Sequence, residues 1–181
     1  MKFYFVRHGQ TEANVQRILA GSGMNHPLTP TGHEQARSLA TKLNSVLQEA
    51  PVKIVSSHML RARQTVEYLE KALDLTSTIE EDWREWHLGE WEGQSYEQFS
   101  HLLLGEGEPN EGETRREFYS RVKRAWEKTH LAEAPYLVVS HGGVWLALQD
   151  LLELPRFRIE NCQLVQVEHV GGLWQARVLE T

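Results

Sequence analysis

The chain has 181 residues, 40% of them hydrophobic, and we expect one domain over residues 1–181 that buries its core without help from metal or disulfides. Its 19 Lys and Arg stand against 25 Asp and Glu, and the net charge of -6 argues against binding to nucleic acid or to an anionic membrane. Only four apolar residues separate Lys2 from Arg7, too few for a signal peptide or a membrane span. We therefore expect a soluble, cytoplasmic protein.

Five short runs along the chain predict strands. Residues 3–6 and 136–139 are continuously apolar, and residues 52–55 resemble them apart from Lys53, so all three predict strands buried on both faces. Residues 163–167 and 173–178 alternate between apolar and polar side chains and predict partly exposed strands.

The segments between these runs predict helices. Apolar residues recur at spacings of three and four over 36–47, 62–73 and 118–126, and residues 29–32 carry start signals for the first of these helices. Residues 144–152 are apolar nearly all round and predict a buried helix. This alternation predicts an α/β fold, a three-layer α/β/α sandwich around a mostly parallel central sheet.

The first predicted strand ends in Arg7, His8 and Gly9. Ligands of open α/β sheets bind at the carboxyl ends of the strands. A guanidinium beside an imidazole suits a phosphoryl group and an attacking nitrogen. Because the motif is short, a strand that simply ends in surface charge explains it about as well as a phosphoryl site does. Other segments of the chain are needed to distinguish the two interpretations.

Three further segments carry groups of the same kind. His141 and two glycines follow strand 136–139, where a close backbone approach and a helix start favour an anion. Arg61 lies in the first turn of the helix after strand 52–55 and is expected to point back toward the strand ends. Glu85 stands among tryptophans, a setting that can keep an acid protonated near neutral pH. These groups together are the parts needed to move a phosphoryl group.

Five ordered motifs resemble those of the histidine phosphatase superfamily, also called the phosphoglycerate mutase-like family. The first is RHG followed by an asparagine, and the second is proline-leucine-threonine followed by a glycine. The third is a serine-rich strand end with RA-x-QT. The fourth is a glutamate followed by a GEWEG run, and the fifth is serine-histidine-glycine-glycine. In this sequence they occupy residues 7–14, 27–32, 56–65, 83–93 and 140–143. The resemblance therefore spans nearly the whole chain.

The resemblance implies a role for each motif residue. His8 is the nucleophile that forms a phosphohistidine, and Glu85 protonates the leaving oxygen and later takes a proton from the attacking water. Arg7, Arg61 and His141 surround the phosphoryl oxygens, and no metal or other cofactor takes part. The implied substrate-binding residues are Arg7, Asn14, Arg61, His141 and Gly142.

Members of the family differ in the insertion between the acid and the second histidine. Here Glu85 and His141 lie 141 minus 85, or 56, positions apart, which is short. A mutase must exclude water while its substrate reorients, whereas hydrolysis needs only a modest lid. We therefore expect a phosphomonoesterase for a small-molecule ester, similar to broad-specificity or α-ribazole phosphatases, with a small lid at about 93–116. The acidic, glycine-rich residues 105–113 predict a mobile surface loop.

Three alternatives stay open for the activity: a phosphoglycerate mutase, a protein phosphohistidine phosphatase and a non-catalytic phosphate-binding regulatory domain. The lid glutamates disfavour a second anionic group on the substrate, unless Arg115 and Arg116 turn inward. Trp86 and Trp91 hint at an aromatic or apolar leaving group, although core packing accounts for at least one of them.

The remaining candidates for chemistry are predicted to be ordinary. The single cysteine, Cys162, is predicted to be a small buried residue rather than a nucleophile. The histidines other than His8 and His141 show no metal-binding spacing. His58 and His87 are held open because each neighbours a site candidate. The sequence does not decide the oligomeric state and leaves a homodimer open.

Overall fold

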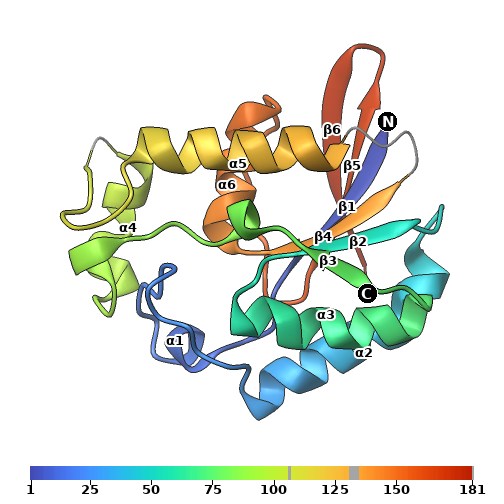
Figure 1. The fold of residues 1–181 in the computed structure, drawn as a ribbon, viewed down its shortest axis with the longest axis horizontal. Helices are drawn as coiled ribbons and strands as arrows, with labels where there is room; N and C mark the ends of the chain where they lie inside the picture. The colour runs from blue at the N-terminus through green and yellow to red at the C-terminus, as the bar shows by residue number, and fades with distance from the viewer. Residues whose placement is uncertain (106, 131–134, 181) are drawn as a thin grey trace.

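The structure, a computed structural model, describes residues 1–105, 107–130 and 135–180. A six-stranded sheet in the order β3-β2-β4-β1-β5-β6 forms its centre (Figure 1). The first four strands of this order are parallel, and β5 and β6 add to β1 in antiparallel fashion. The strands are β1 (Lys2–Arg7), β2 (Lys53–Ser56), β3 (Ser77–Ile79), β4 (Tyr136–Ser140), β5 (Leu164–Val170) and β6 (Leu173–Leu179).

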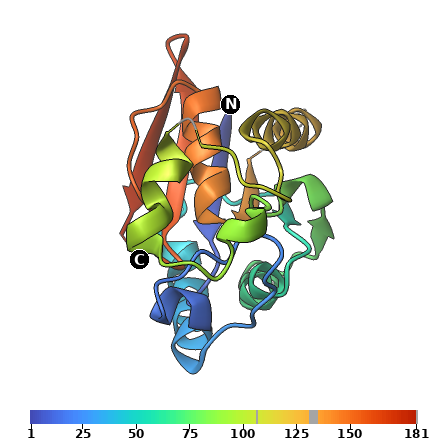
Figure 2. The ribbon, with the colours of Figure 1, turned by 90° about the vertical axis from the view of Figure 1, so that its left-hand side faces the viewer.

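Helices cover both faces of this sheet, so the predicted α/β/α sandwich is confirmed. Two long helices, α2 and α3, pack against one face, and α5 and α6 lie on the opposite face (Figures 1 and 2). The helices are α1 (Glu12–Val15), α2 (Pro30–Val46), α3 (Leu60–Leu73), α4 (Tyr96–Leu104), α5 (Arg115–His130) and α6 (Gly142–Leu151), with 3-10 turns η1 (Glu81–Trp83) and η2 (Gly89–Trp91).

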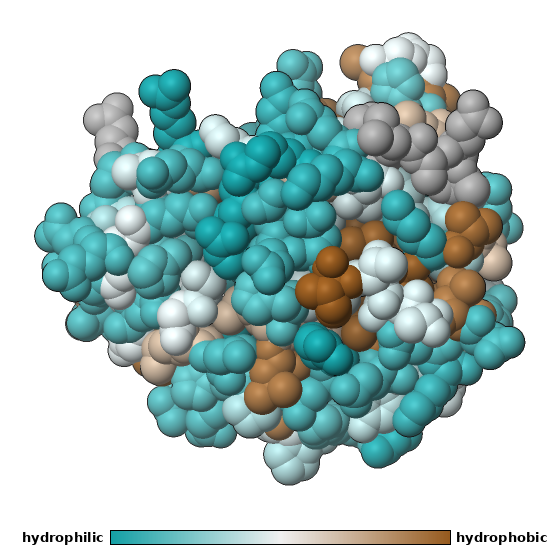
Figure 3. Space-filling view, in the orientation of Figure 1, coloured by the Kyte–Doolittle hydropathy of each residue, from teal (hydrophilic) through white to brown (hydrophobic). Residues whose placement is uncertain are grey.

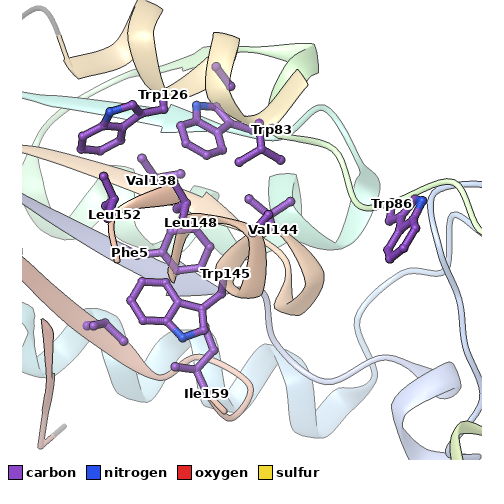
Figure 4. Packing of buried hydrophobic residues seen from close by; sticks show 14 of the residues in the cluster. Phe5, Trp83, Trp86, Trp126, Val138, Val144, Trp145, Leu148, Leu152 and Ile159 are labelled. Atoms are coloured by element: carbon purple, nitrogen blue, oxygen red, sulfur yellow. The ribbon is translucent and has the colours of Figure 1, made fainter. Parts of the chain in front are cut away.

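Strand β1 is buried on both faces and joins two cores. Because side chains alternate along a strand, Phe3 and Phe5 enter the core under α5 and α6, whereas Tyr4 and Val6 enter the core under α2 and α3. The first core is rich in aromatic rings, and the centroids of Phe5 and Trp145 lie 5.2 Å apart (Figure 4). Each large side chain buried in this way contributes about 1.5–3 kcal/mol to stability.

The strand register brings the predicted site segments to one edge of the sheet. Arg7 at the end of β1 is opposite Ser140 at the end of β4. Ser56 at the end of β2 is opposite Val139. The residues that follow these strands, His8 among them, therefore emerge side by side.

The structure also contains elements that the sequence pattern did not identify. The largest is α4, whose Tyr96, Phe99, Leu102 and Leu103 pack against the aromatic core. These side chains have helical spacing, but the helix has only nine residues, too few turns to separate it from chance. Strand β3, helix α1 and the two 3-10 turns are shorter still, and for that reason the sequence pattern did not predict them either. The expected loop at 105–113 carries no helix or strand in its described residues, and Glu106 lies outside them.

The outer surface shown in Figure 3 is mostly hydrophilic, with apolar side chains in small separate groups. Within the described residues, no helix is both long and apolar enough to cross a membrane.

Candidate active site

His8 directly follows β1 and is only 5% exposed. Its Nδ1 lies 2.7 Å from the carbonyl oxygen of Gly9. Because a carbonyl only accepts, Nδ1 carries the proton and Nε2 keeps its lone pair. The amide of Gly9 donates to Thr65 Oγ1 at 3.0 Å, which ties this loop to α3. The ring nitrogen that can attack is thus fixed in identity and position.

Arg61 lies in the first turn of α3, 2% exposed, and points toward the strand ends. Its Nε lies 3.2 Å from His8 Nε2 and 3.2 Å from His141 Nδ1. Its terminal nitrogens donate to the carbonyl oxygens of Met24 at 3.0 Å and Gly21 at 2.9 Å. The guanidinium is therefore held between the two imidazoles.

The second histidine, His141, is fully buried just beyond β4. A guanidinium only donates, so Nδ1 of His141 accepts from Arg61 and the proton of the neutral ring is on Nε2, 2.9 Å from Ser57 Oγ. Burial, followed by the positive charge of Arg61, holds the pKa of both His8 and His141 well below the usual range. Burial lowers the pKa of Arg61 to about 10, which keeps it charged at neutral pH.

Arg7 supplies a second guanidinium at the end of β1. Its Nη1 donates to the carbonyl oxygen of Ile159 at 2.8 Å. Its Nε is buried and, within the part of the chain that the structure describes, has no hydrogen-bond partner. A Cβ added to Gly142 would lie 3.6 Å from this nitrogen. A buried donor without a partner is costly, and an anion between Arg7 and the start of α6 would satisfy it.

Glu85 reaches the start of α6 from the loop after η1. Its carboxylate accepts from the amide of Gly143 at 2.9 Å and from the amide of Trp86 at 3.0 Å. A Cβ on Gly143 would lie 2.4 Å from Glu85 Oε1, so only glycine permits this approach. The carboxylate, Arg61 and His8 all line the same cavity, which has a volume of about 390 Å³.

Asn14 also lines this cavity. Its Oδ1 accepts from the amide and the hydroxyl of Thr11 at 3.0 and 3.1 Å, which leaves the amide nitrogen of Asn14 as its remaining donor. Asn161 was not identified from the sequence, yet its Nδ2 donates to the carbonyl oxygen of His8 at 2.9 Å. No motif marks Asn161, because it acts on the backbone of a distant residue.

Arg121 on α5 is a second residue that sequence reasoning missed. It is 2% exposed and pairs with Glu113 at 2.6 Å. It also donates to the carbonyl oxygens of Asp82, Arg84 and Glu85 at 2.8, 2.9 and 3.2 Å. Arg121 therefore holds the backbone of the loop that carries the acid.

The two histidines that were held open lie away from these groups, whereas the backbone amide of Cys162 donates to the carbonyl oxygen of Arg7 at 2.9 Å. His58 is exposed, and His87 lines an outer groove beside Arg84 and Arg116. Cys162 is buried as predicted, and burial raises the pKa of its thiol to about 12. Among the described residues, no group of three or more His, Cys, Asp or Glu is placed to hold a metal ion.

The fold and this geometry are those expected of an enzyme that transfers a phosphoryl group: a neutral imidazole whose Nε2 lone pair accepts from Arg61, a buried and a half-buried guanidinium group, and a carboxylate beside them. The profile of the histidine phosphatase superfamily, branch 1, matches residues 3–181. The chain belongs to this superfamily, as the sequence motifs predicted. The superfamily and the similar solved structures of phosphatases support phosphatase activity.

Relatives of known name differ in their stated activities. GpmB from Escherichia coli O1:K1, a probable phosphoglycerate mutase, is 30% identical over all of this chain and 92% of its own length. A mycobacterial glucosyl-3-phosphoglycerate phosphatase, solved with VO3, has a TM-score of 0.81 at 26% identity and covers 98% of this chain and 97% of its own. A putative α-ribazole-5'-P phosphatase from Escherichia coli K-12 has a TM-score of 0.81 at 26% identity, with 100% and 96% covered.

Proposed function

We propose that the protein is a metal-independent phosphomonoesterase that hydrolyses a small-molecule phosphate ester through a phosphohistidine on His8. The observation that carries the proposal is the neutral His8 ring, with its proton held on Nδ1 by the Gly9 carbonyl and its Nε2 beside Arg61. An imidazole in this state can attack phosphorus without first losing a proton.

In the first step, His8 Nε2 attacks phosphorus in line and the bond to the ester oxygen breaks. Glu85, in its acid form, gives its proton to that leaving oxygen. In the second step, water attacks the phosphohistidine, Glu85 takes the proton of the water, and inorganic phosphate leaves. Arg7, Arg61 and the amide of Gly142 are proposed to bind the phosphoryl oxygens.

Two further roles complete the proposed site. Asn14 is proposed as an additional donor to the phosphoryl group. His141 becomes a donor at Nδ1 if its ring takes a second proton, which a bound phosphoryl dianion favours electrostatically. Residues 93–116, with α4 at their centre, are proposed as the small lid over the leaving group.

A phosphoglycerate mutase is the second candidate, and the relationship to GpmB favours it. A small-molecule ester is preferred to a phosphohistidine on a folded protein, because a folded partner would have to bring its phosphoryl group to His8, which is only 5% exposed. The intact His8 and Glu85 argue against a non-catalytic domain.

The test is phosphate release from a panel of phosphomonoesters in excess EDTA. We expect release to persist in EDTA, to vanish in His8→Ala and to be unchanged in His169→Ala, a control at the exposed end of β5. Rapid quenching should trap a phosphoryl group on the protein that is stable to alkali and labile to acid. Interconversion of 2- and 3-phosphoglycerate without net phosphate release would favour the mutase instead.

A further inference from the structure

We propose that the leaving group of the substrate is a neutral aromatic or similarly flat apolar group, bound against an apolar wall between α4, α5 and α6. This inference rests on the proposed phosphomonoesterase function and specifies its substrate class. The observations that support it concern the part of the cavity that lies beyond the proposed phosphoryl-binding groups.

The wall of that part is made of apolar and aromatic side chains. Trp86 and Phe118 are stacked, with centroids 5.1 Å apart and planes 6° from parallel. Figure 4 shows Trp86 apart from the central aromatic group, toward the loops that follow β1. Half-buried apolar side chains continue the wall: Ile18, Tyr96, Leu103, Tyr119 and Leu146. These side chains keep apolar surface that a flat ring would cover.

The basic residues of the lid do not turn toward the cavity. Arg115 donates to the carbonyl oxygens of Leu102, Leu103 and Gly105 at 2.9, 2.7 and 2.6 Å. It thereby closes the carboxyl end of α4, and its guanidinium carbon lies 5.0 Å from the Trp86 ring centroid. Arg116 lines the outer groove instead. Neither residue offers a charge to a second anionic group.

The two arginines at the mouth of the cavity already contact other groups of the protein. Arg17 pairs with Glu97 at 3.0 Å. The guanidinium of Arg158 lies over the Tyr96 ring, 5.3 Å from its centroid, and the nearby Glu160 is acidic and exposed. A carboxylate on the leaving group would therefore have to draw Arg17 away from Glu97 or Arg158 away from the Tyr96 ring as it loses water, which is unfavourable.

The cavity volume fits a substrate of this kind. About 390 Å³ is enough for a phosphoryl group and a leaving group of one or two rings. Tyr96 comes from the proposed lid and Arg158 from the segment whose Ile159 carbonyl holds Arg7, so two separate parts of the chain meet at this end of the cavity.

The test compares three phosphate esters of primary alcohols, so that the leaving-group chemistry is similar: benzyl phosphate, propyl phosphate and 3-phosphoglycerate. We expect kcat/KM for benzyl phosphate to exceed that for propyl phosphate by about tenfold to a hundredfold, because the ring buries apolar area. We expect 3-phosphoglycerate to be the poorest of the three. Tyr96→Ala should reduce the ratio of benzyl to propyl, and Leu146→Lys should raise kcat/KM for 3-phosphoglycerate.

Tyr68→Ala is the matched control for Tyr96→Ala. Tyr68 lies on α3, away from the cavity, and like Tyr96 it has an arginine over its ring, with Arg37 at 5.8 Å from the centroid. It should leave all three ratios unchanged. Phosphate release from the panel with 3-phosphoglycerate equal to or better than benzyl phosphate would overturn the inference and leave the phosphatase proposal standing. No release from any ester would reject both.

Discussion

At the scale of single residues, the two buried imidazoles make stability depend on pH. A histidine of the unfolded chain has a pKa of about 6.5, whereas the pKa values of folded His8 and His141 lie well below that. Between these values the unfolded state binds more protons. The free energy of unfolding should therefore be insensitive to these groups above about pH 6.5 and fall below it, by up to about 1.4 kcal/mol per pH unit for each histidine.

Urea unfolding at pH 7.5, 6.5 and 5.5 in a phosphate-free buffer measures this slope. His8→Asn and His141→Asn should each reduce it, because each removes one of the two groups. His169→Asn, at an exposed position, should keep the slope of the parent protein. An unchanged slope in both site variants would mean that neither histidine is held neutral by the fold.

Sequence reasoning located the charged side chains of the site because they follow predicted strands and match family motifs. It could not locate their supports. Arg7 Nη1 binds the Ile159 carbonyl and the His8 carbonyl binds Asn161. Such contacts join distant parts of the chain through backbone atoms, which carry no residue-specific pattern.

At the scale of secondary-structure elements, Arg121 joins α5 to the acid loop. Replacing it with methionine leaves the largely buried Glu113 with only the longer contact to Arg84 at 3.6 Å and frees three carbonyl oxygens. We expect Arg121→Met to lower stability by about 3–5 kcal/mol. We also expect it to lower kcat more for propyl phosphate than for 4-nitrophenyl phosphate, because only the poorer leaving group needs a well-placed acid.

Chemical unfolding and kcat for the two esters measure these effects. Arg124→Met is the control on the same helix, since its side chain is 55% exposed and pairs with Asp82 at the surface. Adding Glu113→Gln to Arg121→Met should restore part of the stability, because it removes a largely buried carboxylate that has lost its closer cationic partner. Equal loss of kcat for both esters would mean that Arg121 supports the fold without positioning Glu85.

Hydrophobic periodicity predicted the helices and strands that are long or fully buried. Helices α2, α3, α5 and α6 and five of the strands were predicted, with ends within a few residues for the strands. Helix α4 and strand β3 are short and lie at the edges of the molecule, where tertiary contacts decide the conformation. Hydrogen bonds to distant residues position such elements. At the start of α4, for example, the amide of Tyr96 donates to the carbonyl oxygen of Arg17 at 2.8 Å.

At the scale of the whole molecule, a chain of net charge -6 places the buried guanidinium of Arg61 and the half-buried guanidinium of Arg7 at one edge of its sheet. In the folded protein Arg61 and Arg7, whose Nε has no hydrogen-bond partner among the described residues, are proposed to form a local anion site that the unfolded chain lacks. An anion that binds there must stabilise the fold as a whole. Vanadate is a suitable probe, because it can adopt the geometry of the transferring phosphoryl group.

We expect vanadate at about one hundred times its Kd to stabilise the protein by about 2.7 kcal/mol, which raises Tm by roughly 5–10 °C for a chain of this length. Thermal unfolding followed by circular dichroism measures the shift. Arg7→Met should abolish most of it, whereas Arg177→Met, on the distant edge strand β6, should retain it. The same shift in Arg7→Met and the parent protein would place anion binding away from Arg7.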